Sequence, residues 1–248
     1  MKKTLIFMAL SLSFILTSCT MGEWKISGSE NIEPSEMIVK RVYPQQPFDR
    51  IDIHTLADVK IVQTDGDSYV RISAPENYID LFEFKNKHGQ LDIKLKKNNV
   101  NIHTNHVKIT VYTPNLHGIE NNGLSNVICN GLNTSELHVE NGGVGSITFS
   151  DLRVPNLKVE CDGIGGITLS GRAAKAKYEC DGVGSIKASG LKARYVKAAV
   201  SGVGSIDCYA TEYIKGEVNG IGSLKYGGHP AKKIFDKGKH VVGSISEL

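Results

Sequence analysis

A cysteine near the start of the chain has the surroundings needed for covalent lipid attachment. Leu16-Thr-Ser-Cys19 has the form of a lipobox, in which an apolar residue and two small residues precede the cysteine. Such a sequence is cut before the cysteine, whose thiol receives a diacylglycerol and whose new amine is acylated. Because each buried methylene contributes about 0.8 kcal/mol, two or three acyl chains anchor a protein stably. We therefore expect Cys19 to be lipidated and to hold the protein to a membrane.

The residues before Cys19 are typical of an exported protein. Lys2 and Lys3 give a charged start, and the apolar run from Leu5 to Leu16 is too short to span a bilayer. We predict a lipoprotein signal peptide over residues 1–18; a plain signal peptide with an incidental cysteine is the alternative. The polar residues 19–34 indicate a lipidated tether. Residues 35–248 then form a single domain.

The net charge argues against a nucleic-acid partner. The whole chain has a formal charge of +3, from 29 basic and 26 acidic residues. Loss of Lys2 and Lys3 with the signal leaves 27 basic against 26 acidic residues, a charge of +1. Nucleic-acid binding needs a clustered basic field, so we expect no such partner.

Two further patterns have spacings that occur in metal or cofactor sites. His103-x-x-His106 lacks an evident acidic or cysteine third ligand, and its Asn-rich surroundings indicate a loop. Gly-x-Gly occurs several times, but a dinucleotide-binding fingerprint needs a third glycine that opens a helix. We expect no catalytic residue, no metal site and no cofactor.

The Gly-x-Gly pattern instead marks an internal repeat with nearly constant spacing. A period of roughly 20 residues is typical of a solenoid, in which each unit buries its apolar face by stacking on its neighbours. A weaker copy begins at Gly123, and a degenerate one, Val241–Ile245, lies near the end. The five clear copies are Gly143-Val-Gly-Ser-Ile147, Gly163-Ile-Gly-Gly-Ile167, Gly182-Val-Gly-Ser-Ile186, Gly202-Val-Gly-Ser-Ile206 and Gly220-Ile-Gly-Ser-Leu224.

The residues between the glycine copies alternate in polarity, which predicts strands with one buried face. Leu157, Val159 and Cys161 alternate with polar Lys158 and Glu160, and each repeat has the same pattern. We predict an all-β chain that forms a right-handed β-helix (β-solenoid) with rungs of about 18–20 residues and Gly-x-Gly corners. The regular repeats cover about residues 115–248, and the N-terminal part is irregular.

Stacking the rungs in register gives specific expectations for the corners and for the outer face. The aliphatic residue between the two glycines is expected to form an internal stack, and the glycines to supply positive φ. A column of lysines and a neighbouring column of glutamates are expected outside, where opposite charges compensate. The corner residues are Val144, Ile164, Val183, Val203 and Ile221; the columns are Lys158, Lys177, Lys197 and Lys215, and Glu140, Glu160, Glu179 and Glu217.

The cysteines of the repeat region are expected to be reduced and buried. Cys129, Cys161, Cys180 and Cys208 all fall on inward positions. Side chains in register on parallel neighbouring strands point the same way, which is a poor geometry for a disulfide. They should behave as small apolar residues.

The irregular N-terminal part is expected to contain two hairpins. Thr64-Asp-Gly-Asp67 resembles a turn between strands at 59–62 and 69–73, and the segment Asn86 to Gly89 resembles one between 81–84 and 91–95.

Three tyrosines form the candidate contact surface. Tyr195 and Tyr213 occupy equivalent places on adjacent rungs, and Tyr209 is near them in sequence. Tyrosines along a flat β face can stack on sugar rings or offer contact area to a partner. The alternative is that they only cap a solenoid corner.

The chain resembles the family described as putative auto-transporter adhesin, head GIN domain. The resemblance lies in Phe48-Asp-Arg-Ile-Asp-Ile53 with Val59-Lys-Ile61, and in corners such as Asp162-Gly-Ile-Gly-Gly-Ile167 and Asp181-Gly-Val-Gly-Ser-Ile186. It covers roughly residues 40–245. It implies a secreted or lipid-anchored β-solenoid of Gram-negative bacteria and brings no catalytic residues. We expect no barrel-sized translocator after residue 228.

These observations lead to one functional hypothesis and two alternatives. We expect a non-enzymatic adhesin or binding module of the cell envelope, anchored through Cys19, with the outer membrane as its location and its periplasmic or surface face left open. Its partners would be the membrane and a glycan or cell-surface ligand. The alternatives are a carbohydrate-active β-helix enzyme and a structural envelope protein without a specific ligand.

Overall fold

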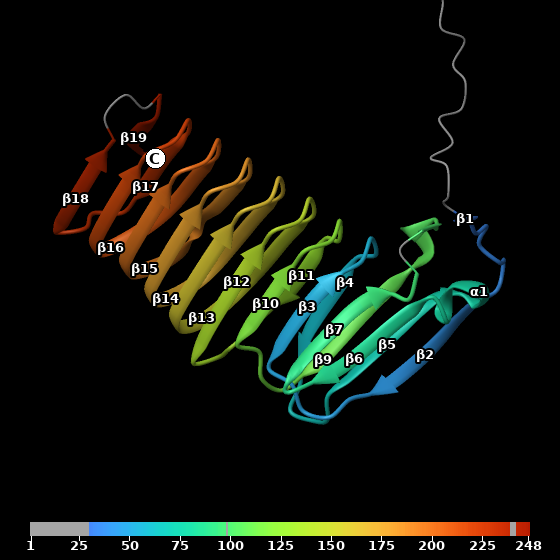
Figure 1. Cartoon of the computed structure of the whole chain (residues 1–248). Helices are drawn as coiled ribbons and strands as arrows, with labels where there is room; N and C mark the ends of the chain where they lie inside the picture. Colours follow the sequence, from blue (N-terminus) through green and yellow to red (C-terminus); the bar gives the residue numbers. More distant parts are fainter. Residues whose placement is uncertain (1–29, 98, 239–241) are drawn as a thin grey trace, which may run out of the picture.

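The computed structural model describes residues 30–97, 99–238 and 242–248. The predicted signal peptide, Cys19 and most of the predicted tether lie outside these residues. The described chain is almost entirely β-structure and forms a solenoid of stacked coils (Figure 1). Its two short helices are α1 (Glu76–Ile79) and η1 (Thr104–His106).

The strands are β1 (Glu30–Asn31), β2 (Ile38–Pro44), β3 (Arg50–His54), β4 (Val59–Gln63), β5 (Tyr69–Pro75), β6 (Phe82–Lys87), β7 (Gln90–Leu95), β8 (Val100–Asn101), β9 (Lys108–Thr113), β10 (Gly118–Asn121), β11 (Val127–Asn130), β12 (Glu136–Asn141), β13 (Ser146–Cys161), β14 (Gly166–Cys180), β15 (Ser185–Val200), β16 (Ser205–Val218), β17 (Ser223–Gly227), β18 (Lys232–Lys237) and β19 (Ser244–Glu247).

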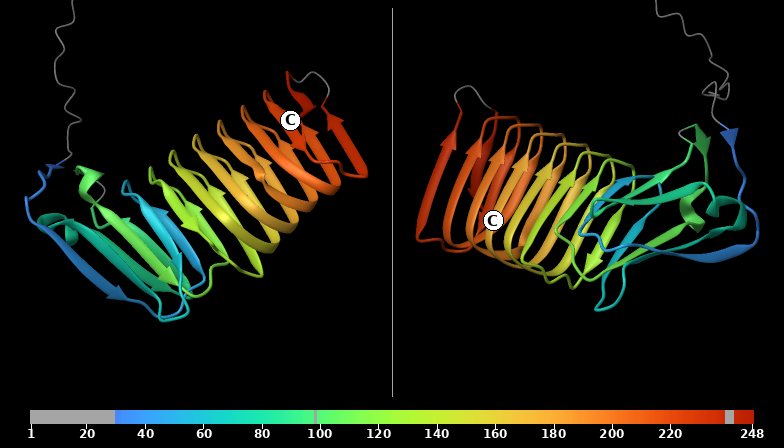
Figure 2. Two further views of the ribbon diagram at one scale, coloured as in Figure 1. Left: turned by 180° about the vertical axis from the view of Figure 1, so that it is seen from behind. Right: turned by 60° about the horizontal axis from the view of Figure 1, so that its bottom comes forward.

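The regular coils are flattened, with two parallel ladders on opposite faces joined at one edge by the Gly-x-Gly corners and at the other by a rounded bend (Figure 2). The first half of each long strand, β13 to β16, lies on one face, and the second half lies on the other after the bend. We call the second the lysine face, because Lys158, Lys177, Lys197 and Lys215 pair in register along it. The predicted register of the repeats is confirmed.

The N-terminal part continues both faces, but out of chain order. β3 and β4 form a coil that lies between the coil of β7 and β9 and the coil of β10 and β11, with parallel pairing on both sides. Antiparallel strands then close this end: β6 pairs with β7, and β5 and β2 extend from β9. Within the predicted tether, Glu30–Asn31 pair with β8.

One of the two predicted hairpins is confirmed and the other is wrong. β6 and β7 pair through the turn at His88 and Gly89, whose φ values of 51° and 78° suit a tight hairpin turn. Residues 64–67 do connect β4 to β5, but these strands are not partners. β9 lies between them, parallel to β4 and antiparallel to β5. Residues 64–67 do form the connection that their composition predicts. However, β9, which comes later in the chain, pairs with both β4 and β5 and so separates them.

The core consists of the inward residues of both faces. Val159, Ile167 and Tyr178 are fully buried, as is nearly every other residue that the alternation assigned to the inside. Burying each aliphatic side chain contributes about 1.5–3 kcal/mol. In-register stacking makes this core one continuous column that runs from the N-terminal coils to β17.

The corner aliphatic residues are exposed, which corrects the prediction that they form an internal stack. Ile164 is 66% exposed, and its equivalents on the other coils are 52–78% exposed. The two glycines of each Gly-x-Gly corner lie against the backbone of the preceding coil, so the residue between them has no room inside and points to solvent. The corner row, as we call it, consists of Leu124, Val144, Ile164, Val183, Val203, Ile221 and Val242.

Close backbone approach, and not positive φ, explains the corner glycines. A Cβ on Gly163 would lie 2.0 Å from the carbonyl oxygen of Gly143, and one on Gly184 would lie 2.0 Å from that of Gly165. Both distances are impossible for a real Cβ. Among the described residues, glycines with positive φ occur at four positions, none in a Gly-x-Gly corner.

The space inside each corner is filled by the last side chain of the preceding strand. Asn141 Nδ2 donates to the carbonyl oxygen of Gly145 at 2.8 Å, and the Cys161 thiol donates to that of Gly165 at 3.3 Å. Cys129, Cys161, Cys180 and Cys208 are buried free cysteines, as predicted. Within the described residues, no helix is long and apolar enough to cross a membrane.

A matched pair of substitutions tests which side chain near the corner points to solvent and which points into the core. Ile164→Asn should change the free energy of unfolding by less than about 0.5 kcal/mol, because the side chain is in solvent. Ile167→Asn, three residues later and fully buried, should cost more than about 4 kcal/mol, because it removes apolar packing and buries an unpaired amide. Urea unfolding measures both, and equal losses would contradict the assigned orientation.

Thiol labelling tests the state of the inner cysteines. Burial raises the pKa of Cys129 and Cys208 to about 12, so few reactive thiolates form at neutral pH. In a Cys19→Ser variant, a thiol reagent should label almost none of the four cysteines in the native protein and all four after denaturation without reductant. Fewer than four labels after denaturation would reveal a disulfide.

Candidate ligand-binding groove

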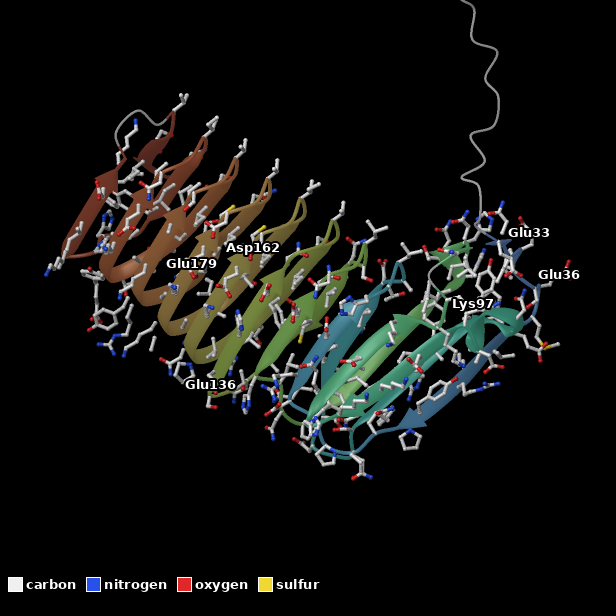
Figure 3. The ribbon with its side chains drawn as sticks, in the orientation of Figure 1. Glu33, Glu36, Lys97, Glu136, Asp162 and Glu179 are labelled. Carbon is white, nitrogen blue, oxygen red and sulfur yellow. The ribbon has the colours of Figure 1, made fainter. Side chains whose placement is uncertain are left out.

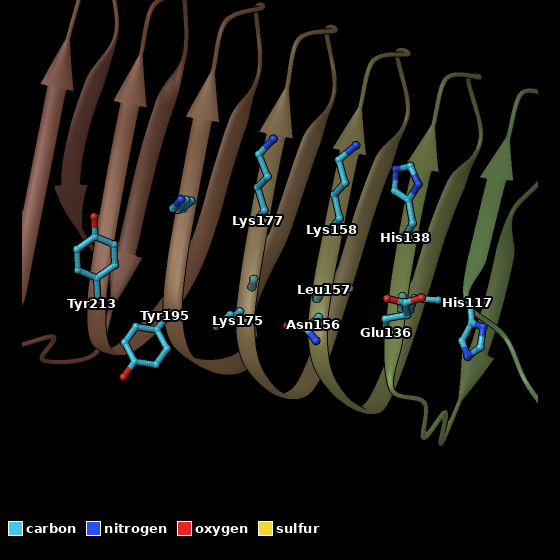
Figure 4. A pocket seen from close by; sticks show the side chains of 13 residues that line it. His117, Glu136, His138, Asn156, Leu157, Lys158, Lys175, Lys177, Tyr195 and Tyr213 are labelled. Carbon is cyan, nitrogen blue, oxygen red and sulfur yellow. The ribbon is translucent and has the colours of Figure 1, made fainter.

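A groove of about 710 Å³ runs across several coils of the lysine face (Figure 4). β12 and the second halves of β13 to β16 form its floor, so its walls repeat from one coil to the next. Its lining is rich in lysine and contains two tyrosines. The lining residues are His117, Glu136, Leu137, His138, Asn156, Leu157, Lys158, Lys175, Ala176, Lys177, Tyr195, Lys197 and Tyr213.

The outward side chains of the groove form two rows, because alternate residues of a strand point to the same side. Each row runs along the solenoid axis with one residue per coil, at a spacing of about 4.8 Å. The first row, nearer the Gly-x-Gly corners, is His138, Lys158, Lys177 and Lys197; the second, nearer the bend, is Glu136, Asn156, Lys175, Tyr195 and Tyr213.

Most lysines of the first row are neutralised by a glutamate two residues later on the same strand. Lys158 Nζ lies 2.7 Å from Glu160 Oε2, and Lys177 Nζ lies 2.7 Å from Glu179 Oε2. The hydrogen bond to Glu160 raises the pKa of Lys158 and outweighs burial, which acts to lower it. These pairs form the predicted compensation between the two columns.

The pattern breaks in the coil of β15, where Ala199 occupies the glutamate position. No carboxylate among the described residues lies within ion-pair distance of Lys197, and the same holds for Lys175 in the second row. Both lysines are exposed. They lie on either side of Tyr195, one on the neighbouring coil and one on the same strand, and so leave positive charge beside an aromatic ring.

Tyr195 and Tyr213 pair in register on adjacent strands and both line the groove. Tyr195 is 39% exposed, and the Arg194 guanidinium lies 5.5 Å from its ring centroid. A hydrogen bond to Glu212, which itself pairs with Arg194, raises the pKa of the Tyr195 hydroxyl. The Tyr213 ring has Lys232 Nζ at 5.8 Å. Ring and cation contacts of this kind hold both tyrosines at the end of the groove.

Tyr209, the third tyrosine of the predicted contact surface, does not line the groove. It pairs with Lys192 on one side and Gly227 on the other, and Lys192 Nζ lies 6.0 Å from its ring centroid. Proximity in sequence suggested a cluster, but the strand turns through the bend between residues 209 and 213.

The acidic side chains of the lysine face pair in register as a ladder nearer the corners, and Figure 3 labels one of its members, Glu179. Burial, together with the neighbouring Glu120 and Glu160, raises the pKa of Glu140. At Glu160 burial also acts to raise the pKa, but hydrogen bonds from Lys158 and His138 more than offset it and hold the pKa below its ordinary value. The ladder runs through Asp92, Asp52, Glu120, Glu140, Glu160 and Glu179.

One part of this ladder has the donor set of a metal site. Ligand atoms of His138, Glu140 and Glu160 lie within 4.8 Å of one another, and zinc accepts such ligands. However, the Glu160 oxygen that contacts His138 also holds Lys158 Nζ at 2.7 Å. A cation would have to displace this ammonium, so we assign the cluster to the ion-pair network.

The histidines of the sequence pattern His103-x-x-His106 are not part of the cluster of His138, Glu140 and Glu160. His103 Nε2 is 3.6 Å from Glu33 Oε2, and His106 ends η1. Neither residue lines the groove. The cluster of His138, Glu140 and Glu160 could have been found in the sequence only from the repeat register. That register aligns His138 with Lys158 and Glu140 with Glu160 on the neighbouring strand.

The structure is similar to solved proteins from Bacteroides and Parabacteroides species. A putative adhesin from Bacteroides fragilis is 35% identical, with a TM-score of 0.83 over 88% of this chain and 100% of that one. A putative lipid binding protein from Parabacteroides distasonis (21% identity, TM-score 0.72, 88% and 100% covered) and a putative adhesin from Parabacteroides merdae (18%, 0.66, 89% and 100%) share the fold. No curated protein matches the chain.

A family model supplies the assignment. The model described as putative auto-transporter adhesin, head GIN domain, matches residues 47–230, which cover the irregular coils, the Gly-x-Gly corners and the whole groove. The resemblance predicted from the sequence is confirmed, and the chain belongs to the head GIN domain family of putative auto-transporter adhesins.

Proposed function

We propose that this protein is a lipid-anchored, non-enzymatic adhesin that binds an acidic glycan in the groove of the lysine face. The observation that carries the proposal is the group formed by Lys175, Tyr195 and Lys197, in which two lysines without a carboxylate partner flank an exposed ring. The adhesin-like role agrees with the family and with the relatives named as adhesins.

The chemistry of the groove suits a chain of charged sugars. An aromatic ring offers a face on which the apolar face of a sugar can pack. An ammonium group can make charge-assisted hydrogen bonds to a carboxylate or sulfate, and these are about twice as strong as neutral ones. Because the groove runs along the solenoid axis over several coils, it can contact several consecutive sugars.

The arrangement of acids supports binding without hydrolysis. Glycosidases of the common type need two carboxyl groups on either side of the scissile bond, about 5–9.5 Å apart. Of the described residues that line the groove, Glu136 is the one acid. Of the glutamates near the groove, Glu160, Glu179 and Glu217 are paired with Lys158, Lys177 and Lys215, and Glu212 is paired with Arg194. Glu140 lies in the ladder beside His138.

The cell-envelope location rests on the lipobox and on the signal peptide before it. An anchor at Cys19 in the outer membrane would hold the groove outside the bilayer. A structural envelope role without a ligand remains the second candidate, and the absence of any glycan binding would favour it.

Substitutions in the groove test the binding site, with polygalacturonate as the acidic probe and dextran as the neutral one. Tyr195→Ala with Lys197→Ala should weaken polygalacturonate binding at least tenfold, equal to about 1.4 kcal/mol, measured by titration calorimetry. The wild-type protein should bind dextran much more weakly and should release no shortened or unsaturated products from polygalacturonate.

Tyr209→Ala with Lys192→Ala is the matched control, because this pair has the same chemistry outside the groove. It should leave binding unchanged. Equal losses in both double variants with unchanged melting temperatures would place the site elsewhere. Product formation would favour the enzyme, and no binding of either polysaccharide would count against the acidic-glycan ligand.

Cys19→Ser tests the anchor. Removal of the acyl chains should move the protein from the membrane and detergent fractions to the soluble fraction, since two or three chains supply the stable attachment. A variant that still partitions into detergent like the parent would show that the lipidation hypothesis is wrong.

A further inference from the structure

The corner row is an exposed apolar feature of the described residues that neither the fold nor the groove uses. All seven of its members are Val, Ile or Leu, and each is more than half exposed. The residue two places before them varies among Asp, Asn, Ser, Gly and His. The fold therefore accepts polar residues at the corner, but the tip of each corner is aliphatic. Isolated exposed apolar residues need no explanation, whereas a contiguous apolar patch marks an interaction surface.

The geometry of the row is a narrow ridge beside a shallow trough. Seven side chains spaced at about 4.8 Å make a line roughly 29 Å long. Next to it, the second glycine of each corner and the following small residue leave a groove of about 520 Å³ over four coils, from Ile164–Gly166 to Ile221–Ser223. The ridge and trough form one continuous edge of the solenoid (Figures 1 and 2).

This strip is too small to be the whole interface with a second copy. Three residues of width at about 3.3 Å each give roughly 10 Å, so the strip covers about 300 Å² per copy. Stable protein interfaces bury about 800 Å² per partner. A bilayer surface sets no such lower limit on area, because each apolar side chain gains independently by entering it.

The path of the chain places this edge next to the predicted anchor. Glu30, where the described chain begins in β1, lies on the same edge of the molecule as the corners (Figures 1 and 2). Glu30 is only 11 positions after Cys19 in the sequence, a reach of at most about 40 Å. The tether therefore starts from the corner edge, and this favours contact of the corner edge, rather than of the opposite bend, with the bilayer.

We propose that the corner row docks into the interface of the membrane, with its aliphatic tips among the lipid headgroups and upper acyl chains. This inference rests on the proposed anchor for its orientation. The described corners contain no lysine or arginine, and their charged residues are Asp162 and Asp181. The attraction is therefore apolar, suits uncharged lipids and does not depend on salt.

Depth-dependent quenching tests the proposal independently of native lipidation. A hexahistidine tag in place of residues 1–19 keeps every described residue and tethers the protein to phosphatidylcholine vesicles that contain nickel-chelating lipid. An environment-sensitive fluorophore is attached at Val183→Cys in the corner row, or at Arg172→Cys, which is exposed at the bend of a neighbouring coil. The inner cysteines are buried and stay unlabelled in the native protein.

Brominated acyl chains should quench the Val183→Cys probe at least threefold more than the Arg172→Cys probe, in low and high salt alike. Adding Ile164→Ser and Val203→Ser should reduce the quenching at position 183 to the control level. Equal quenching at the two positions would overturn the proposal. So would shielding of the Val183→Cys probe in solution without vesicles, which would identify a second copy as the occupant. Failure of the anchor itself shows separately in the Cys19→Ser experiment.

Discussion

The structure depends on one steric constraint, the contact between backbones of successive coils at the corners. Where two successive coils bend sharply in register, a Cα of one coil lies against a carbonyl oxygen of the other. Gly163 lies so close to Gly143 that there is no space for a Cβ. Glycine at both positions permits the approach, so the ladders of both faces continue without a break. This contact therefore also aligns the buried side chains of the core and the outward side chains of the lysine face from coil to coil. In the five Gly-x-Gly corners, a side chain at either glycine position would separate the coils and misalign the rows that form the groove.

Strict alignment has an electrostatic cost, because it places like charges about 4.8 Å apart along the axis. The chain offsets this by placing a lysine row beside the acidic ladder on the same strands, and His138 and Lys158 share Glu160. Where Ala199 interrupts the ladder, the compensation stops and Lys197 keeps an unpaired charge. Local loss of one carboxylate thus creates the group that distinguishes one coil from its neighbours. In a repeat protein, a site can arise from one departure from the repeat.

Much of the fold could be predicted from the sequence because the repeat supplies several aligned copies of one pattern. Alternation assigned Val159, Tyr178 and Ile167 to the inside correctly, and register gave the charge columns. The prediction for the corner residues was wrong because we assumed that an apolar side chain is buried. Ile164 lies at a sharp corner, where the two-residue alternation stops and the direction of the side chain depends on the backbone of the neighbouring coil. The hairpin at residues 64–67 failed because the competing partner, β9, enters the chain only after β5, β6 and β7. The groove itself could not be predicted from the sequence, because its lining comes from β12 to β16 and from His117 before β10.

The interleaved N-terminal coils determine the order in which the chain can fold. Each regular coil needs only the coil immediately before it in the chain to stack, as in the pairing of Ile186 with Ile206. The coil of β3 and β4 is different, because Arg50 pairs with Gln90 on one side and with Gly118 on the other. Closing such loops costs more chain entropy and slows folding. A chain that emerges N-terminus first during synthesis therefore delivers this coil early and completes it only after about residue 130 has emerged. Both edges of β3 and β4 lack partners until β7 and β9 have emerged, at about residue 113, and one edge stays open until about residue 130. An open strand edge can pair with another chain, so this coil needs protection for longer than a regular coil does.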